Sequence, residues 1–147
     1  MFLAVAVPPG STASKLSVCD IMHAGRFAHS DVVISGRILF TMHGAFLTTD
    51  SCPDSSYDLV LLYPKSVGAP PVPFDLDPSA IGKLKNFFRP SGGTAAACGV
   101  LSGRVFYKKR FHSRPEGAGP VGNGFGPRGA FRAAFVLRSV DAAHACG

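Results

Sequence analysis

The sequence lacks the short motifs that mark most simple enzymes and metal sites. Glu116 is the only glutamate, and charged residues make up 16% of the 147 residues, against roughly 25% in an average soluble domain. The chain has no G-x-S-x-G motif of hydrolases, no H-E-x-x-H motif of zinc peptidases and no C-x-x-C pair. We therefore expect a chain that is not an enzyme, with no catalytic residues and no metal.

A dinucleotide cofactor is not expected either. Residues 117–122 match the G-x-G-x-x-G pattern, but Pro120 lies inside it and more loop follows. Phosphate binding by this pattern needs a strand before it and a helix that begins within it. The sequence therefore predicts no cofactor.

Long hydrophobic runs are absent too, since no segment approaches the ~20 apolar residues of a transmembrane helix. The first 14 residues hold a short apolar run and then small residues, similar to the tail of a secretory signal without its basic beginning. Two interpretations stay open for residues 1–15. They are the remnant of a signal peptide whose start lies further upstream, which implies a periplasmic or secreted protein, or they are the disordered tail of a cytoplasmic one.

Charge is divided unevenly along the chain. Residues 1–81 carry four basic and seven acidic side chains, a sum of −3, whereas residues 82–147 carry eleven basic and two acidic ones, a sum of +9. A basic half is what binding to a phosphate backbone or another anionic ligand requires, although it is also a common aid to solubility.

One sequence pattern occurs twice. Val33–Phe40 returns as Val100–Tyr107, with Val, Ser, Gly and Arg identical in order. Each copy is rich in β-branched and aromatic residues, which favours a strand, and the central glycine is typical of a bulge or tight bend. A long loop rich in glycine and proline is expected over 112–129. We expect five strands, over residues 31–42, 45–49, 57–63, 97–111 and 131–140.

Two helices are expected beside these strands. Ser17 can cap a short N-terminal helix, and Asp77 followed by a proline predicts a helix over residues 78–89. A single helix between the third and fourth strands is the arrangement of the OB-fold, a five-stranded Greek-key barrel. The sequence therefore predicts one mainly β, OB-like barrel domain over residues 16–141, followed by a frayed tail at residues 142–147.

A cysteine-bearing helix, a strand with a central glycine and a cysteine-bearing turn follow one another early in the chain. They are Ser17–Met22, Val33–Ile38 and Phe46–Cys52, and a glycine-rich loop at Gly124–Gly126 and a closing strand at 131–140 come later. Together they resemble a group of small uncharacterised bacterial proteins. The pattern of that group is a short Cys-bearing helix, a V-x-V-x-G strand and an L-x-D-x-x-C turn. The resemblance covers most of residues 17–140.

This resemblance implies a small exported or envelope OB-like barrel in which Cys19 and Cys52 lie near one another. Four cysteines permit three pairings into two disulfides. A bridge between Cys19 and Cys52 would pin the helix across the barrel mouth, and the alternative is two buried thiols. A second bridge, between Cys98 and Cys146, would join neighbouring strand ends. The sequence favours the first bridge, because Cys146 lies in the expected tail.

Basic and aromatic residues interleave where the fourth strand ends. On an OB barrel, exposed aromatic rings stack on bases while Lys and Arg hold phosphates. The alternative is an ordinary strand, with Val105 and Tyr107 directed inward and Arg104, Phe106 and Lys108 outward. The candidate ligand-binding residues are Arg104, Phe106, Tyr107, Lys108, Lys109, Arg110 and Arg114.

The function expected from the sequence is a non-catalytic binding or structural module, exported to the cell envelope. The alternative is an OB-fold protein that binds single-stranded nucleic acid. The sequence does not identify the ligand of the binding module. The candidate partner that it offers is nucleic acid or another anionic ligand, bound through the basic C-terminal half.

Overall fold

The computed structural model describes most of the chain from Leu16 onward. The described residues are 16–23, 25–41, 43–48, 59–64, 66, 72–85, 95–117 and 119–146. Residues 1–15, for which the sequence leaves a signal remnant and a disordered tail open, lie outside them, and so does Cys52.

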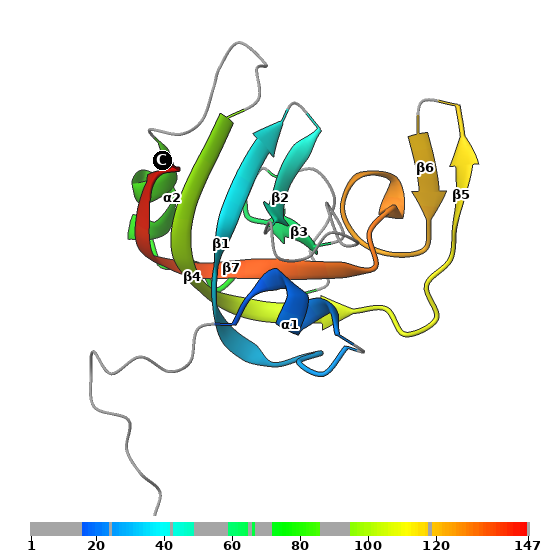
Figure 1. The fold of residues 1–147 in the computed structure, drawn as a ribbon, viewed down its shortest axis with the longest axis horizontal. Coiled ribbons are helices and arrows are strands. Elements are labelled where there is room, and N and C mark those ends of the chain that lie inside the picture. Colours follow the sequence, from blue (N-terminus) through cyan, green and yellow to red (C-terminus); the bar gives the residue numbers. More distant parts are fainter. Residues whose placement is uncertain are drawn as a thin grey trace, which may run out of the picture.

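Five strands of the described chain form a closed barrel (Figure 1). Around the barrel their order is β1-β2-β3-β7-β4, and β4 closes it by pairing with β1. Neighbouring strands are antiparallel except β3 and β7, which are parallel. The prediction of a mainly β, five-stranded barrel is confirmed. The strands are β1 (Asp31–Thr41), β2 (Gly44–Thr48), β3 (Leu59–Leu62), β4 (Ala95–Tyr107) and β7 (Ala133–Ala145).

The two copies of the repeat lie side by side in β1 and β4. They pair so that Gly36 lies opposite Gly99, and both are long, curved strands (Figure 1). The register of β4 against β7 shifts next to Gly103. A Cβ at Gly103 would lie closer than 3.0 Å to the Val136 carbonyl oxygen. Glycine is therefore required here for the close approach of the two backbones.

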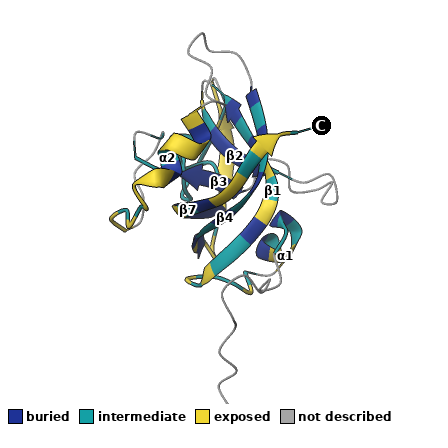
Figure 2. Ribbon diagram, turned by 90° about the vertical axis from the view of Figure 1, so that its left-hand side faces the viewer, coloured by how far each residue is buried: buried dark blue, intermediate teal, exposed yellow. Residues whose placement is uncertain are grey.

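Buried side chains fall into two clusters, one inside the barrel and one outside it. Phe135 is the largest fully buried side chain of the interior cluster. Successive side chains of a strand point to opposite faces, so Phe46, between the interior residues Ala45 and Leu47, lies on the outside. Figure 2 shows buried residues along the strands and exposed ones on the outer side of helix α2. The outer cluster contains Phe46, Val60, Leu62, Phe106, Ala134 and Val136, with Phe74, Phe125 and Phe131 packed against it.

Helix α1 (Val18–Met22) packs against the barrel through Val18 and Ile21, which are fully buried. The predicted cap at Ser17 is present and is completed by a reciprocal partner. The Ser17 hydroxyl accepts a hydrogen bond from the Asp20 N–H at 3.2 Å, and the Asp20 carboxylate accepts one from the Ser17 N–H at 2.8 Å. These bonds satisfy two donors that the first turn of a helix leaves free.

The Asp20 carboxylate should make the stability of α1 depend on pH. The backbone and side-chain hydrogen bonds from Ser17 lower the pKa of Asp20 below its usual value. A pKa lower in the folded than in the unfolded chain stabilises the fold above about pH 4, and that stabilisation is lost as pH falls through the folded pKa. We expect Asp20→Asn to destabilise by up to about 1 kcal/mol near neutral pH. Urea unfolding should show this difference shrinking as the pH falls below about 4, and a difference independent of pH would contradict the assignment.

Helix α2 (Ser79–Leu84) follows β3 and precedes β4 in the chain. Asp77 acts at its start, because its carboxylate accepts hydrogen bonds at 2.9 Å from both the N–H and the hydroxyl of Ser79. The helix packs on β7, where the Lys83 ammonium donates to the Val140 carbonyl oxygen at 2.8 Å. Residues 86–89, where the sequence predicts its last turn, lie outside the described residues.

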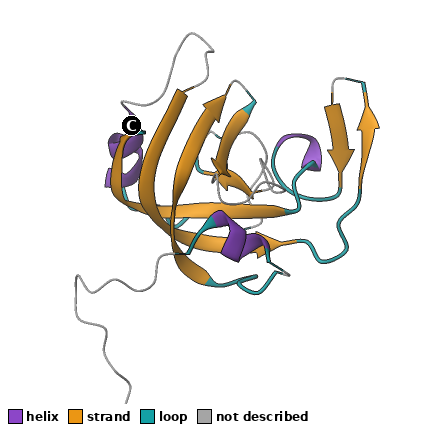
Figure 3. Ribbon diagram, viewed as in Figure 1, coloured by secondary structure: helices purple, strands orange, loops and turns teal. Residues whose placement is uncertain are grey.

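Two expectations about irregular segments are wrong. The predicted loop at 112–129 contains a hairpin of β5 (Ser113–Glu116) and β6 (Gly119–Gly122), which stands apart from the barrel (Figure 3). The predicted tail is strand as far as Ala145, which pairs with Ala97. Its alanine-rich sequence has little strand propensity, so pairing with β4 across a register shift overrides the local preference.

Candidate anion-binding surface

The predicted basic segment leaves the barrel at the end of β4 and runs beside the start of β7. The Lys108 N–H donates to the Arg132 carbonyl oxygen at 2.9 Å, which fixes the first residue beyond the strand. Lys108, Lys109 and Arg110 are all exposed. Three consecutive cations therefore project from a backbone that is anchored to the barrel.

Two aromatic rings flank an arginine next to these cations. The guanidinium carbon of Arg132 lies 5.5 Å from the Phe111 ring centroid and 5.8 Å from that of Tyr107. The Arg132 Nη1 also lies 3.4 Å from the Tyr107 hydroxyl, to which it donates. A cation within about 6 Å of a ring face is attracted to its π-electrons. Both rings are partly exposed, so a ligand can reach the cluster.

A single amide side chain holds the segment in place. The Asn123 Nδ2 donates to the Arg110 carbonyl oxygen, and its Oδ1 accepts from the His112 N–H, both at 2.9 Å. Further along, the Arg128 guanidinium donates to the Glu116 carbonyl oxygen at 3.0 Å. These bonds tie the hairpin and the loop after it into one unit with the basic segment.

The charge of this region is almost entirely positive. Between residues 104 and 138 there are eight Lys and Arg residues and one acid, Glu116, which pairs with Arg114 at 3.1 Å. We call the exposed cations and rings beyond β4 the basic surface. It consists of Tyr107, Lys108, Lys109, Arg110, Phe111, Arg114, Arg128 and Arg132.

Phe106 does not belong to this surface. Only 6% of it is exposed, and its ring contacts those of His29 and Phe125 in the outer cluster. Its side chain points away from the barrel interior, as the strand alternation predicts, but Phe125 of the following loop covers it. A ring that is covered in this way is not available to stack on a ligand.

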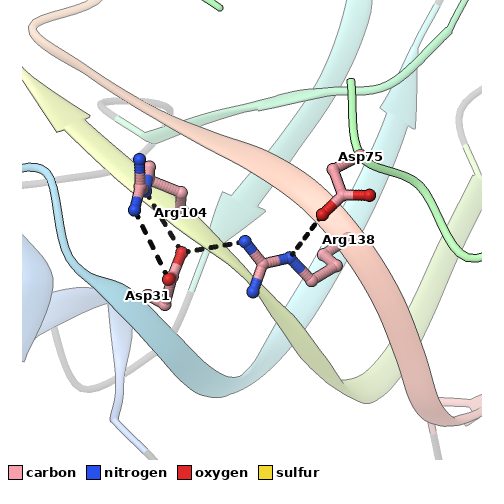
Figure 4. A network of polar contacts seen from close by, with 4 residues as sticks. All are labelled: Asp31, Asp75, Arg104 and Arg138. Atoms are coloured by element: carbon pink, nitrogen blue, oxygen red, sulfur yellow. Dashed lines mark hydrogen bonds and ion pairs between the residues drawn. The ribbon is translucent and has the colours of Figure 1, made fainter. Parts of the chain in front are cut away.

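Arg104 also points outward from β4, but it joins a network of its own (Figure 4). Its Nε and Nη2 atoms lie 3.1 and 3.4 Å from the two oxygens of Asp31. The Arg138 Nη2 contacts Asp31 at 3.2 Å, and its Nε lies 3.7 Å from Asp75. Sequence reasoning missed the other three members of this network. The pairing of β1, β4 and β7 brings Asp31 and Arg138 to Arg104, and Asp75 comes from the segment before α2.

The cysteines are disulfide-bonded wherever the structure describes them. Cys98 and Cys146 form a bridge with a Cα–Cα distance of 5.0 Å. The extension of β7 brings Cys146 next to the start of β4. The Cys98–Cys146 bridge, which the sequence favoured less than a bridge between Cys19 and Cys52, is therefore present. Cys19 is also disulfide-bonded. Its expected partner, Cys52, lies outside the described residues.

Comparison with protein-family models, curated proteins and solved structures finds no match for this chain. Function is therefore inferred from the residues and their geometry. Among the described residues, no group of three or more His, Cys, Asp or Glu side chains is placed to hold a metal ion. No helix within the same ranges is long and apolar enough to cross a membrane.

Proposed function

We propose that the protein is a non-catalytic binding module of the OB type that acts in the cell envelope on an anionic ligand. Three features support the OB assignment. The barrel closes in the order β1-β2-β3-β7-β4, its only parallel pair joins the third and fifth barrel strands, and α2 lies between the third and fourth. Barrels of this kind bind polymers through loops and exposed strand faces.

The disulfides support the proposed compartment. Disulfides persist in the periplasm and outside the cell and are rare in the cytosol, where thiols are kept reduced. The Cys98–Cys146 bridge and the bonded Cys19 therefore favour an exported protein.

The basic surface carries the proposal for the ligand. Its cations project beyond one end of β4, they are exposed, and Glu116 is the only acid among them. A concentration of one sign of charge attracts a flexible polyanion over several contacts at once, so binding should weaken steeply with salt.

Single-stranded nucleic acid is the second candidate ligand, and the Arg132 cluster favours it. Tyr107 and Phe111 flank a guanidinium, and rings and guanidinium groups both provide planes on which bases stack. The burial of Phe106 leaves two rings for this purpose rather than three.

Fluorescence anisotropy with a labelled single-stranded oligonucleotide tests both candidates, with heparin as the polyanion without bases. We expect micromolar binding at low salt that falls about 50-fold between 50 and 200 mM salt, if about four phosphates are contacted. Lys108→Gln/Lys109→Gln should weaken binding strongly. The control, Arg26→Gln/Arg37→Gln, removes the same charge from exposed positions elsewhere.

The outcomes of this titration separate the two ligands. Heparin and the oligonucleotide binding alike would support an anionic ligand and contradict base recognition. Preference for the oligonucleotide, lost in Phe111→Ala, would support nucleic acid. No binding of either polymer at low salt would contradict the anionic ligand itself.

A further inference from the structure

Two arginines hold one carboxylate on the outer face of β1, β4 and β7. Asp31 accepts both Arg104 and Arg138, and the side chains of all three residues are close to half exposed (Figure 4). Two positive charges face one fixed negative charge, so this arrangement carries one positive charge in excess. Among the residues that the structure describes, Asp75 is the acid that balances this excess.

Asp75 is a weak partner for Arg138. Its carboxylate lies 3.7 Å from the Arg138 Nε, and 92% of its side chain is exposed. Exposed ion pairs at such a distance contribute little, because water screens them and the side chain loses rotamer freedom. Within the part of the chain that the structure describes, the Nη1 groups of Arg104 and Arg138 make no hydrogen bond or ion pair. Donors are thus left for another anion.

A hollow of about 280 Å³ opens beside these two arginines. Its apolar wall comes from strand β7 and from the segment before α2, and its polar wall comes from the network. Pockets for drug-sized ligands measure about 300–1,000 Å³, so this hollow suits a smaller molecule. It is lined by Val72, Pro73, Asp75, Arg104, Val136, Leu137 and Arg138.

We propose that this hollow binds a small organic carboxylate with a short apolar chain. The ligand carboxylate takes the place of Asp75 at Arg138 and accepts hydrogen bonds from Arg104. Its chain lies along Val72 and Val136. Guanidinium groups are suited to this role, because their planar donors match the two oxygens of a carboxylate. Asp75 then acts as a competitor that an incoming ligand displaces.

This site is separate from the basic surface, since Arg104 and Arg138 lie in the strands and not in the segment beyond β4. A small monocarboxylate also differs in size and charge from a polyanion. A failure of the proposed function would therefore leave this carboxylate site untouched, and a failure of the site would leave the proposed function untouched.

The test is an NMR titration of ¹⁵N-labelled protein with hexanoate, acetate and hexan-1-ol as separate probes. We expect hexanoate to bind with a dissociation constant of about 1 mM or below and to shift the amide signals of Arg104 and of residues 136–138. Asp75→Asn should tighten hexanoate binding several-fold. Asp141→Asn removes the same charge from an exposed residue of β7 outside the hollow, and it should leave hexanoate binding unchanged.

Arg138→Gln should weaken hexanoate binding about tenfold or more, since a charge-assisted pair is lost. Equal tightening in Asp75→Asn and Asp141→Asn would overturn the proposal, because a general effect of net charge explains it. Acetate binding as tightly as hexanoate would overturn the proposal as well, because the apolar wall would then contribute nothing. Hexan-1-ol binding as tightly would overturn it too, because the arginines would then contribute nothing. Absence of shifts in both wild type and Asp75→Asn would exclude the site.

Discussion

Gly103→Ala should destabilise the protein by about 3 kcal/mol or more, whereas Gly36→Ala should change its stability by less than about 1 kcal/mol. The two glycines hold the same position in the two copies of the repeat. At Gly103 an added Cβ would lie closer than 3.0 Å to the Val136 carbonyl oxygen and to the ring of Phe135. Neither can withdraw, because β7 is paired on both edges there and the ring fills the barrel interior.

Gly36 provides the matched control. Its nearest atom to an added Cβ is the Thr48 carbonyl oxygen at 3.4 Å, an ordinary contact. Urea unfolding of both variants, followed by circular dichroism, measures the difference directly. Equal destabilisation of the two variants would show that the close approach of β4 and β7 at Gly103 is not what requires glycine.

Removal of the Cys98–Cys146 bridge should cost about 4 kcal/mol. The bridge closes a loop with a sequence separation of 48, and the chain-entropy model relates that length to a stabilisation of this size. For a chain of this length, such a loss lowers the melting temperature by roughly 10 °C or more. The residues of β7 beyond Val140 are mostly exposed, so without the bridge they should separate from β4 first.

Cys98→Ser/Cys146→Ser, compared with wild type by calorimetry, tests this expectation while Cys19 keeps its bond. Hydrogen exchange should show the lost protection confined at first to residues 141–145. An unchanged melting temperature would mean that strand pairing alone holds the end of β7. Mass spectrometry of unreduced, alkylated protein tests the predicted Cys19–Cys52 bridge, and labelling of all four cysteines after export would contradict it.

The sequence was sufficient to predict those parts of the barrel whose signals are local. The repeat identified β1 and β4, the apolar run around Leu59–Leu62 identified β3, and Ser17 identified the start of α1. Each of these depends on propensity, alternation or a cap within a few residues. Such signals are present in the chain before it folds, which explains why they were informative.

The parts that could not be predicted depend on contacts between distant segments. Strand alternation predicted that the Phe106 side chain points outward, but its burial needs Phe125 to return over the outer face. The β5–β6 hairpin contains prolines and glycines that are typical of a loop. The Arg104 network requires the register of three strands. None of these features has a signature within a short window of sequence.

The position of β7 in the barrel determines when the molecule can finish folding. β7 comes last in sequence among the five strands of the barrel, and it lies between β3 and β4. Until residues 133–145 are available, β3 has an unpaired edge and the barrel stays open. Such long-range pairing makes folding slow, because the chain loses loop-closure entropy before the contacts between distant segments stabilise it. A chain emerging from a ribosome or a membrane channel would therefore close its barrel only after its final strand had been released.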